Sequence, residues 1–154
     1  MSGHQVQIER DVAASPEEVW RVLTDLDHAA ETLSGVSRVE LLTDGPYTVG
    51  TRWRETRKMF GKEATEEMRV TALEAPARTT VEADSAGVHY VTVFTLTPTG
   101  DGTRLAMTFT ARQPDPSRVQ KLTWAVFGKL GIKATSKVMA RDLEDIARRA
   151  ESAS

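Results

Sequence analysis

The feature that most constrains the fold is the final long segment, from Asp115 to Ala150. It contains no proline after Pro116. From Ile132 to Arg149, an apolar stripe alternates with charged residues at helical spacing. The residues before this segment have the pattern of strands, apart from a short helical region near the N-terminus. An amphipathic helix that follows a series of strands must bury its apolar face, so the sequence predicts a helix lying across an antiparallel sheet.

Alternation with a period of two predicts about seven strands. The predicted strands are Gln5–Val12, Val36–Thr43, Gly50–Phe60, Lys62–Leu73, Arg78–Asp84, Val88–Thr97 and Thr103–Ala111. Tight reversals are expected at Gly61 and at residues 99–102, and short connections favour an antiparallel meander. Between the first two strands, Ser15 and Pro16 begin a short helix that is expected to end near residues 25–27. A second short helix is predicted from His28 to Leu33.

Composition and charge exclude several classes of protein. Hydrophobic residues make up 40% and charged residues 27%, as in ordinary globular proteins, and 154 residues fit a single domain, residues 1–154. A net charge of −2, with acids and bases interspersed, predicts no nucleic-acid partner. The absence of cysteine excludes disulfides and favours a reducing compartment. We find no signal sequence and no apolar run near the ~20 residues that a membrane span needs, so we expect a cytoplasmic protein.

The predicted strand Gly50–Phe60 carries charged candidates for a site. One face is wholly polar and belongs in water: Arg52, Arg54, Thr56 and Lys58. The opposite face should look inward: Trp53, Glu55, Arg57 and Met59. Two inward charges are costly unless they are paired or hydrated. Glu55 and Arg57 therefore either surround a polar group of a ligand, as ionisable groups do at functional sites, or form a hydrated pair at the rim.

Glu66 on the following strand shares the more apolar face with Met68, so it should point the same way as Glu55. Placed opposite Arg57, it would give two carboxylates around one guanidinium, a weak candidate for acid–base chemistry. The alternative is a set of alternating charges on an exposed hairpin end.

Tyr90 is the candidate from the strand Val88–Thr97. It shares the bulkier face with Phe94, so its ring should pack inward while its hydroxyl bonds to a ligand or to the backbone. His89 lies on the opposite face and is expected to point outward. His4 and His28 have no partners at metal-ligand spacing, and no phosphate-binding or dinucleotide-binding motif is present, so we expect no metal and no cofactor.

Methionines and the final helix complete the candidate lining. Met68, Met107 and Met139 would form a deformable apolar wall, although methionines are more often plain core. Ile132, Thr135 and Met139 share the helical stripe that should face the sheet. The stretch Leu122–Leu130 is apolar on nearly all sides and must be covered, as a gate over a cavity or as a dimer surface.

Several short motifs match a known family. They are Val6-x-Ile8, Ala14–Trp20, Asp25-Leu26-Asp27, Gly35-Val36, Gly50-Thr51-x-Trp53 and the amphipathic final helix. Together they resemble the START-like helix-grip superfamily (SRPBCC), in particular its bacterial polyketide cyclase/dehydrase and lipid-transport members, over essentially the whole chain. The resemblance implies an α+β helix-grip fold, in which a curved antiparallel sheet of about seven strands wraps around a long C-terminal helix, with two short helices between strands 1 and 2. It also implies an internal cavity for a hydrophobic small molecule.

We therefore expect the protein to bind or carry a lipid-like or polyketide-like molecule between the helix and the sheet, as a monomer or a weak homodimer. The residues expected to contact that ligand are Trp53, Glu55, Arg57, Met59, Met68, Tyr90, Phe94, Met107, Phe127, Ile132, Thr135 and Met139. One alternative is a cyclase or dehydratase that uses Glu55, Arg57, Glu66 or Tyr90 for proton transfer. Another is a module that binds a protein partner through Trp124 and Phe127.

Overall fold

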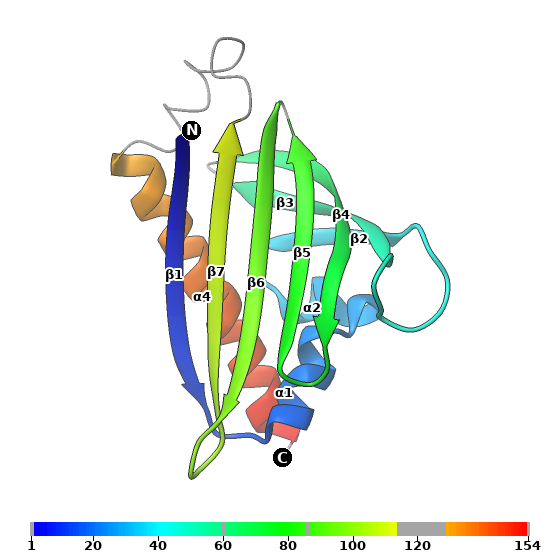
Figure 1. The fold of residues 1–154 in the computed structure, drawn as a ribbon, viewed down its shortest axis with the longest axis vertical. Helices are drawn as coiled ribbons and strands as arrows, with labels where there is room; N and C mark the ends of the chain where they lie inside the picture. The colour runs from blue at the N-terminus through cyan, green and yellow to red at the C-terminus, as the bar shows by residue number, and fades with distance from the viewer. Residues whose placement is uncertain (1, 60, 86, 114–128, 154) are drawn as a thin grey trace.

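The computed structural model describes residues 2–59, 61–85, 87–113 and 129–153, and its elements follow the predicted order (Figure 1). The elements are β1 (Ser2–Val12), α1 (Pro16–Leu23), the 3-10 helix η1 (Leu26–His28), α2 (Ala29–Thr32), β2 (Val36–Leu41), β3 (Arg52–Met59), β4 (Lys62–Glu74), β5 (Arg78–Ser85), β6 (Val88–Pro98), β7 (Thr103–Gln113) and α4 (Lys129–Ala153). Strand boundaries differ from the predicted ones by a few residues, as is usual for strand ends.

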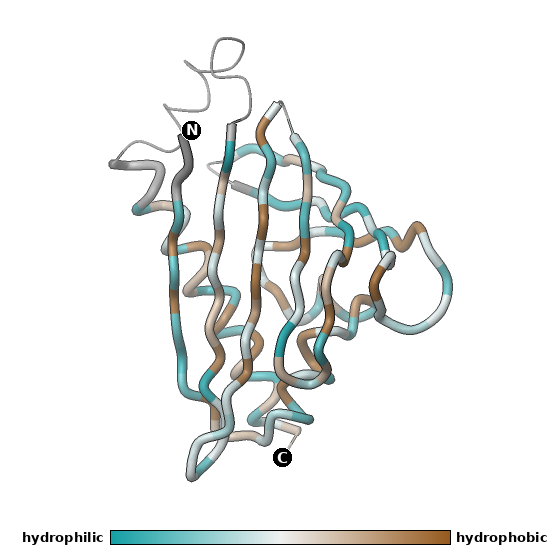
Figure 2. The backbone as a smooth tube through the Cα atoms, viewed as in Figure 1, coloured by the Kyte–Doolittle hydropathy of each residue, from teal (hydrophilic) through white to brown (hydrophobic). Residues whose placement is uncertain are grey.

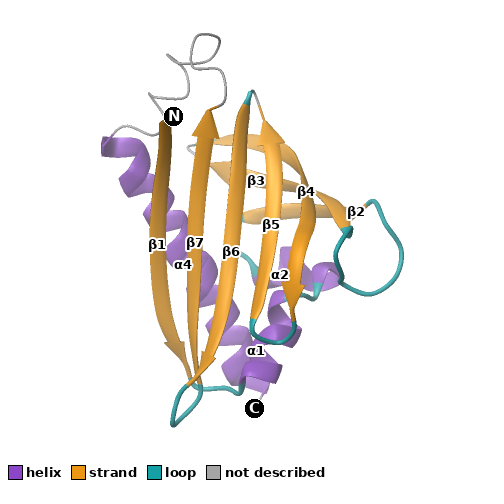
Figure 3. Cartoon of the chain, viewed as in Figure 1, coloured by secondary structure: helices purple, strands orange, loops and turns teal. Residues whose placement is uncertain are grey.

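The strands form a seven-stranded sheet in the order β1-β7-β6-β5-β4-β3-β2, and every neighbouring pair is antiparallel. The sheet curves, and α4 runs across its inner face behind β1 and β7, with α1 near the C-terminal end of α4 (Figure 3). The predicted meander is confirmed for β2 to β7. Pairing of β1 with β7 brings the start of the chain beside the last strand.

The first helix begins as predicted. The Ser15 hydroxyl accepts a hydrogen bond from the Glu18 backbone N–H at 3.2 Å, and Pro16 occupies the first turn. The helix ends at Leu23, earlier than expected, where the Thr24 hydroxyl donates to the Trp20 carbonyl at 2.8 Å. The predicted second helix, His28–Leu33, is observed as the shorter α2, and η1 lies between it and α1.

Gly102 allows the turn between β6 and β7 to touch the end of β1. A Cβ atom at this position would collide with the Val12 carbonyl oxygen. Beside it, the buried Thr103 hydroxyl donates to the Ala14 carbonyl at 2.8 Å. These contacts fix the chain where it leaves β1 for α1.

The main core fills the space between α4, α1 and the β1–β7–β6 side of the sheet. Leu105, Leu143 and Val19 are fully buried there, and hydrophobic positions alternate with hydrophilic ones along the strands (Figure 2). A smaller apolar cluster around Trp53, Val70 and Val81 lies on β3, β4 and β5. The space between these two clusters contains the candidate site.

The predicted final helix is observed as α4. The described part of the helix begins at Lys129. Residues 114–128, which include Trp124 and Phe127, lie outside the described residues, so the proposed gate, dimer surface and partner anchor stay predictions. Among the described helices, none is long and apolar enough to cross a membrane.

Candidate functional site

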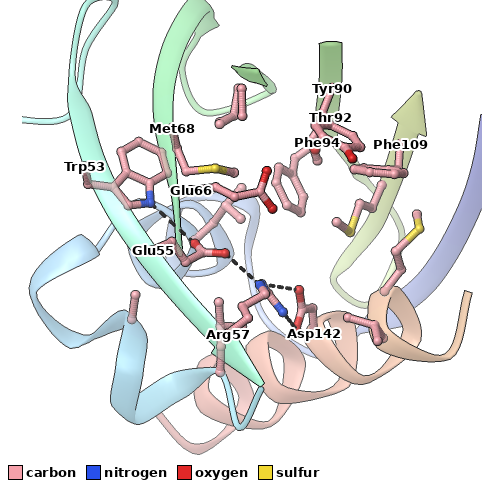
Figure 4. A pocket seen from close by; sticks show the side chains of 18 of the residues that line it. Trp53, Glu55, Arg57, Glu66, Met68, Tyr90, Thr92, Phe94, Phe109 and Asp142 are labelled. Atoms are coloured by element: carbon pink, nitrogen blue, oxygen red, sulfur yellow. Dashed lines mark hydrogen bonds and ion pairs between the residues drawn. The ribbon is translucent and has the colours of Figure 1, made fainter. Parts of the chain in front are cut away.

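A cavity of about 430 Å³ lies between α4 and the inner face of the sheet (Figure 4). Helix α1, η1 and α2 close one side of it. Much of its wall is apolar, and includes Leu23, Leu26, Trp53, Met68, Val81, Phe94, Met107, Phe109, Val138 and Met139. Its volume falls within the range of roughly 300–1,000 Å³ that is typical of small-molecule sites.

Strand β3 supplies the polar wall, through the alternation that its sequence predicts. Trp53, Glu55 and Arg57 line the cavity, and Glu55 and Arg57 form a mostly buried ion pair there. On the opposite face, Arg52 and Arg54 are exposed, and Arg54 forms an ion pair with Glu40 at 3.4 Å. Thr56 was expected in water but is buried. Its hydroxyl is satisfied there by a hydrogen bond with the Thr65 hydroxyl of β4, at 2.8 Å.

Arg57 is held by two carboxylates, and we call Glu55, Arg57 and Asp142 the Arg57 cluster. Its Nε donates to Glu55 Oε2 at 2.7 Å. Its Nη1 and Nη2 donate to the two Asp142 oxygens at 3.2 and 2.7 Å. The other Glu55 oxygen accepts from Trp53 Nε1 at 3.4 Å. Because one cation serves two anions here, the guanidinium is committed to protein partners.

The three charged side chains of the Arg57 cluster are buried, so each charge needs a partner of opposite sign. The side chains of Arg57, Glu55 and Asp142 are only 18%, 13% and 6% exposed. Burial alone would lower the pKa of Arg57, but the charges of Glu55 and Asp142 raise it above its ordinary value. Burial raises the pKa of Asp142, and Arg57 opposes that rise. Removal of Arg57 would leave two buried carboxylates without their counter-charge.

Asp142 is a site residue that the sequence reasoning missed. It lies on α4 in line with Thr135, Met139 and Ile146, at spacings of seven, three and four residues that place all four on one helical stripe. That spacing is the signal that could have found it, since a charged residue in an apolar stripe needs a buried partner. One turn away, Asp145 accepts hydrogen bonds from the backbone N–H and hydroxyl of Ser34, at 2.9 and 2.8 Å.

Glu66 lines the cavity, but the prediction that it lies opposite Arg57 is wrong. Strand pairing places Glu66 opposite Glu55 and Ala64 opposite Arg57, because the hairpin pairs Met59 with Lys62. The second carboxylate on Arg57 is Asp142. Burial and the neighbouring Glu55 charge raise the pKa of Glu66, and the charge of Arg57 partly offsets this rise.

Tyr90, on β6, lines the cavity with Phe94 and Thr92. Its ring stacks on Phe109, with the ring centroids 5.6 Å apart. Burial and the charge of Glu66 raise the pKa of Tyr90 to about 12, so its hydroxyl stays protonated at neutral pH. His89 does not line the cavity and instead bonds to Asp84 and Glu82, as its outward position predicts.

The remaining predicted ligand contacts divide into two sets. Met68, Met107, Thr135 and Met139 line the cavity, although their contact with a ligand stays a prediction. The side chains of Met59 and Ile132, and all of Phe127, lie outside the described residues.

Tyr47, which sequence reasoning missed, lines the cavity from the β2–β3 loop, and its hydroxyl bonds to the buried Thr79 hydroxyl at 2.8 Å. Its loop has no periodic pattern that would have indicated this position.

The histidine and acidic side chains of the described residues are not arranged like those of a metal site. Among the described residues, no group of three or more histidine or acidic side chains is arranged to hold a metal ion. What the cavity offers instead is a large apolar surface, the Arg57 cluster, whose members bond to one another, and the further carboxyl group of Glu66. Such a site is suited to an amphipathic organic molecule.

Comparison with protein families matches residues 3–151 to the family described as polyketide cyclase/dehydrase and lipid transport. The structure of TTHA0849 from Thermus thermophilus is similar, with a TM-score of 0.80, 24% identity, and coverage of 98% of this chain and 99% of that chain. The Zhui aromatase/cyclase from Streptomyces sp. R1128 gives a TM-score of 0.79, with 21% identity and coverage of 97% and 94%.

A point mutant of norcoclaurine synthase from Thalictrum flavum, in complex with a transition state analogue, gives a TM-score of 0.71. It is 18% identical, and the match covers 98% of this chain and 96% of that chain. No curated protein matches the sequence. The likeness to solved structures shows a shared fold, and the family match extends over nearly all of the sequence. The chain belongs to the polyketide cyclase/dehydrase and lipid transport family.

Proposed function

We propose that the protein binds a hydrophobic or amphipathic small molecule in the cavity between α4 and the sheet. The observation that carries this proposal is the 430 Å³ apolar cavity with ionisable groups on one of its walls. Transfer of an apolar ligand from water into the cavity would be favourable by roughly 25 cal/mol for each Å² of apolar surface buried. The polar wall would orient one end of the ligand.

The position of Val138 allows a direct test of this proposal. Val138 lies on α4, half-buried, and lines the cavity, whereas Ala140 is exposed on the same helix. Val138→Trp should fill part of the cavity and weaken binding of the neutral fluorophore N-phenyl-1-naphthylamine by about tenfold or more, a change of about 1.4 kcal/mol or greater. Ala140→Trp adds the same side chain to the solvent face and should bind like the wild type. Equal binding by both variants, or no binding by the wild type, would contradict the proposal.

A second candidate function is proton-transfer catalysis of the cyclase or dehydratase kind. Glu66 favours it, because a carboxyl group with a raised pKa inside an apolar cavity suits a general acid or base. Glu55 suits this role less well, since both of its oxygens already accept hydrogen bonds from Trp53 and Arg57. The Tyr90 hydroxyl, which stays protonated, would be a hydrogen-bond donor to a substrate carbonyl.

The enzymatic candidate is tested with a polyketide-like substrate and two matched variants. Glu66→Gln should abolish turnover while binding of the substrate changes little, because the amide keeps the size but cannot exchange a proton. Glu67→Gln alters the neighbouring residue, which pairs with Arg52 on the outer face, and should retain turnover. Parallel loss of turnover and binding in Glu66→Gln would assign Glu66 to binding alone.

A further inference from the structure

The charges around the cavity do not balance. Three carboxyl groups line it, those of Glu55, Glu66 and Asp142. Arg57 pairs with two of them through the three hydrogen bonds of the Arg57 cluster, but its single positive charge balances only one. Lys62 also borders the cavity but is exposed to solvent. The buried part of the wall therefore carries more carboxyl groups than cations, and Glu66 is the one without an ion-pair partner among the described residues.

Glu66 is also the carboxylate that is open to a ligand. Figure 4 shows it pointing into the cavity, while Glu55 and Asp142 point toward Arg57. Within the described residues, no hydrogen bond or ion pair is formed by the Glu66 carboxylate. Its pKa is raised by burial and by the charge of Glu55, and the charge of Arg57 only partly offsets this rise, so the ionised form is short of counter-charge. A bound cation would supply that counter-charge.

The neighbouring groups would also favour a cation over an anion. Aromatic rings of Trp53, Tyr90 and Phe94 line the same space, and the faces of aromatic rings attract cations. A ligand carboxylate, by contrast, would meet Glu66 and Glu55. At Arg57 it would compete for a single positive charge that Glu55 and Asp142 already share.

We propose that the ligand of this cavity is a hydrophobic amine, whose ammonium group forms an ion pair with Glu66 while its apolar part lies along the methionine and aromatic wall. This inference rests on the proposed binding function and adds the chemical class of the ligand. Neutral molecules of the same shape should bind more weakly, and fatty carboxylates should bind most weakly of all.

Three probes with the same ten-carbon chain test the proposal: decylamine, decanol and decanoate, titrated by calorimetry below their micelle concentrations. For the wild type at neutral pH, decylamine should bind about tenfold or more tightly than decanol, because a hydrogen bond between an ammonium and a carboxylate is stronger than one from a neutral hydroxyl. Glu66→Gln should remove this preference. Glu67→Gln makes the same change of charge on the outer face of β4 and should retain it.

The outcomes separate the two proposals. If none of the three probes binds, the binding function itself fails, and the inference fails with it. If the probes bind with equal affinity, or if decanoate binds most tightly, the binding function survives and the assignment of an amine is overturned. A preference for decylamine that persists in Glu66→Gln would also overturn the assignment, because the ammonium would then lie elsewhere.

A second measurement uses only the wild type, in case Glu66→Gln folds poorly. Decylamine, like a lysine side chain, stays protonated at acidic and neutral pH, whereas the Glu66 carboxyl ionises only as the pH rises through its raised pKa. The ratio of decylamine affinity to decanol affinity should therefore increase as the pH rises through the pKa of Glu66. A ratio that stays constant over this range would contradict the ion pair.

Discussion

On the outer face of the sheet, His89 lies between Glu82 and Asp84, with both nitrogen–oxygen distances at 2.7 Å. On the inner face, Arg57 lies between Glu55 and Asp142 at similar distances. The geometry is alike but the surroundings differ: Asp84 is 61% exposed, whereas Asp142 is 6% exposed. Water and ions screen the outer group, while the inner group depends on its own partners.

This difference shows how one sheet can carry two kinds of charged cluster. Alternation along β3, β4, β5 and β6 distributes the charged side chains between the faces. A pair on the outer face adds little to the free energy of unfolding, because exposed ion pairs are worth about 0–1 kcal/mol. On the inner face each buried charge depends on its partners, and Glu66 has no ion-pair partner among the described residues.

The largest expected effect comes from removing the inner cation. Arg57→Met should lower the free energy of unfolding by about 3–5 kcal/mol, because it leaves two buried carboxylates without a partner. Arg54→Met, on the exposed face of the same strand, should cost less than about 1 kcal/mol. Urea denaturation measures both changes. The deficit of Arg57→Met should shrink at acidic pH, where the carboxyls become protonated, and a deficit no larger than that of Arg54→Met would contradict the comparison.

A smaller effect of opposite sign is expected at Glu66. Because burial raises the pKa of Glu66 above its unfolded value, its ionised form destabilises the fold once the pH rises through the folded pKa. Glu66→Gln should therefore stabilise the protein at neutral pH, by less than Arg57→Met destabilises it, and this gain should vanish at low pH. Glu67→Gln should destabilise slightly or not at all. A loss of stability in Glu66→Gln at neutral pH would show that its charge is already compensated.

The smallest effect is expected on the outer face. Hydrogen bonds to Asp84 and Glu82 raise the pKa of His89. Its contribution to stability is thus fully present below the unfolded pKa of about 6.5 and is lost as the pH rises through the folded pKa. His89→Gln should cost less than about 1 kcal/mol at acidic pH and nothing at alkaline pH. Thermal denaturation across this pH range would show the pattern, and a cost independent of pH would argue against the ionic role.

The sequence predicted the fold well because most of its signals are local. Ser15 and Pro16 begin α1, turn residues separate the strands, and the alternation along β3 places Trp53, Glu55 and Arg57 on one face. Each of these depends on neighbours in the chain. Pairing of β1 with β7 depends instead on residues about a hundred positions apart, and no local pattern indicates it.

The site was predicted less completely, because it depends on register and on contacts between elements. A shift of two residues in the β3–β4 pairing separates the predicted arrangement, with Glu66 opposite Arg57, from the observed one, with Glu66 opposite Glu55. Asp142 lies among apolar residues on one stripe of α4, where the helical pattern alone gives a charged residue no partner. Its role depends on Arg57, which lies 85 positions away in the sequence.

The most direct test of the central claim, that the cavity binds a ligand, is the response of its methionine methyl groups in NMR spectra. Met68, Met107 and Met139 line the cavity from three different elements, β4, β7 and α4. Titration with N-phenyl-1-naphthylamine should shift the three methyl signals together, because the aromatic rings of the bound fluorophore would lie beside them. Signals of Leu143, which is fully buried in the main core, should move little. Unchanged methionine signals, or shifts confined to the exposed Leu41 and Val49, would contradict the account.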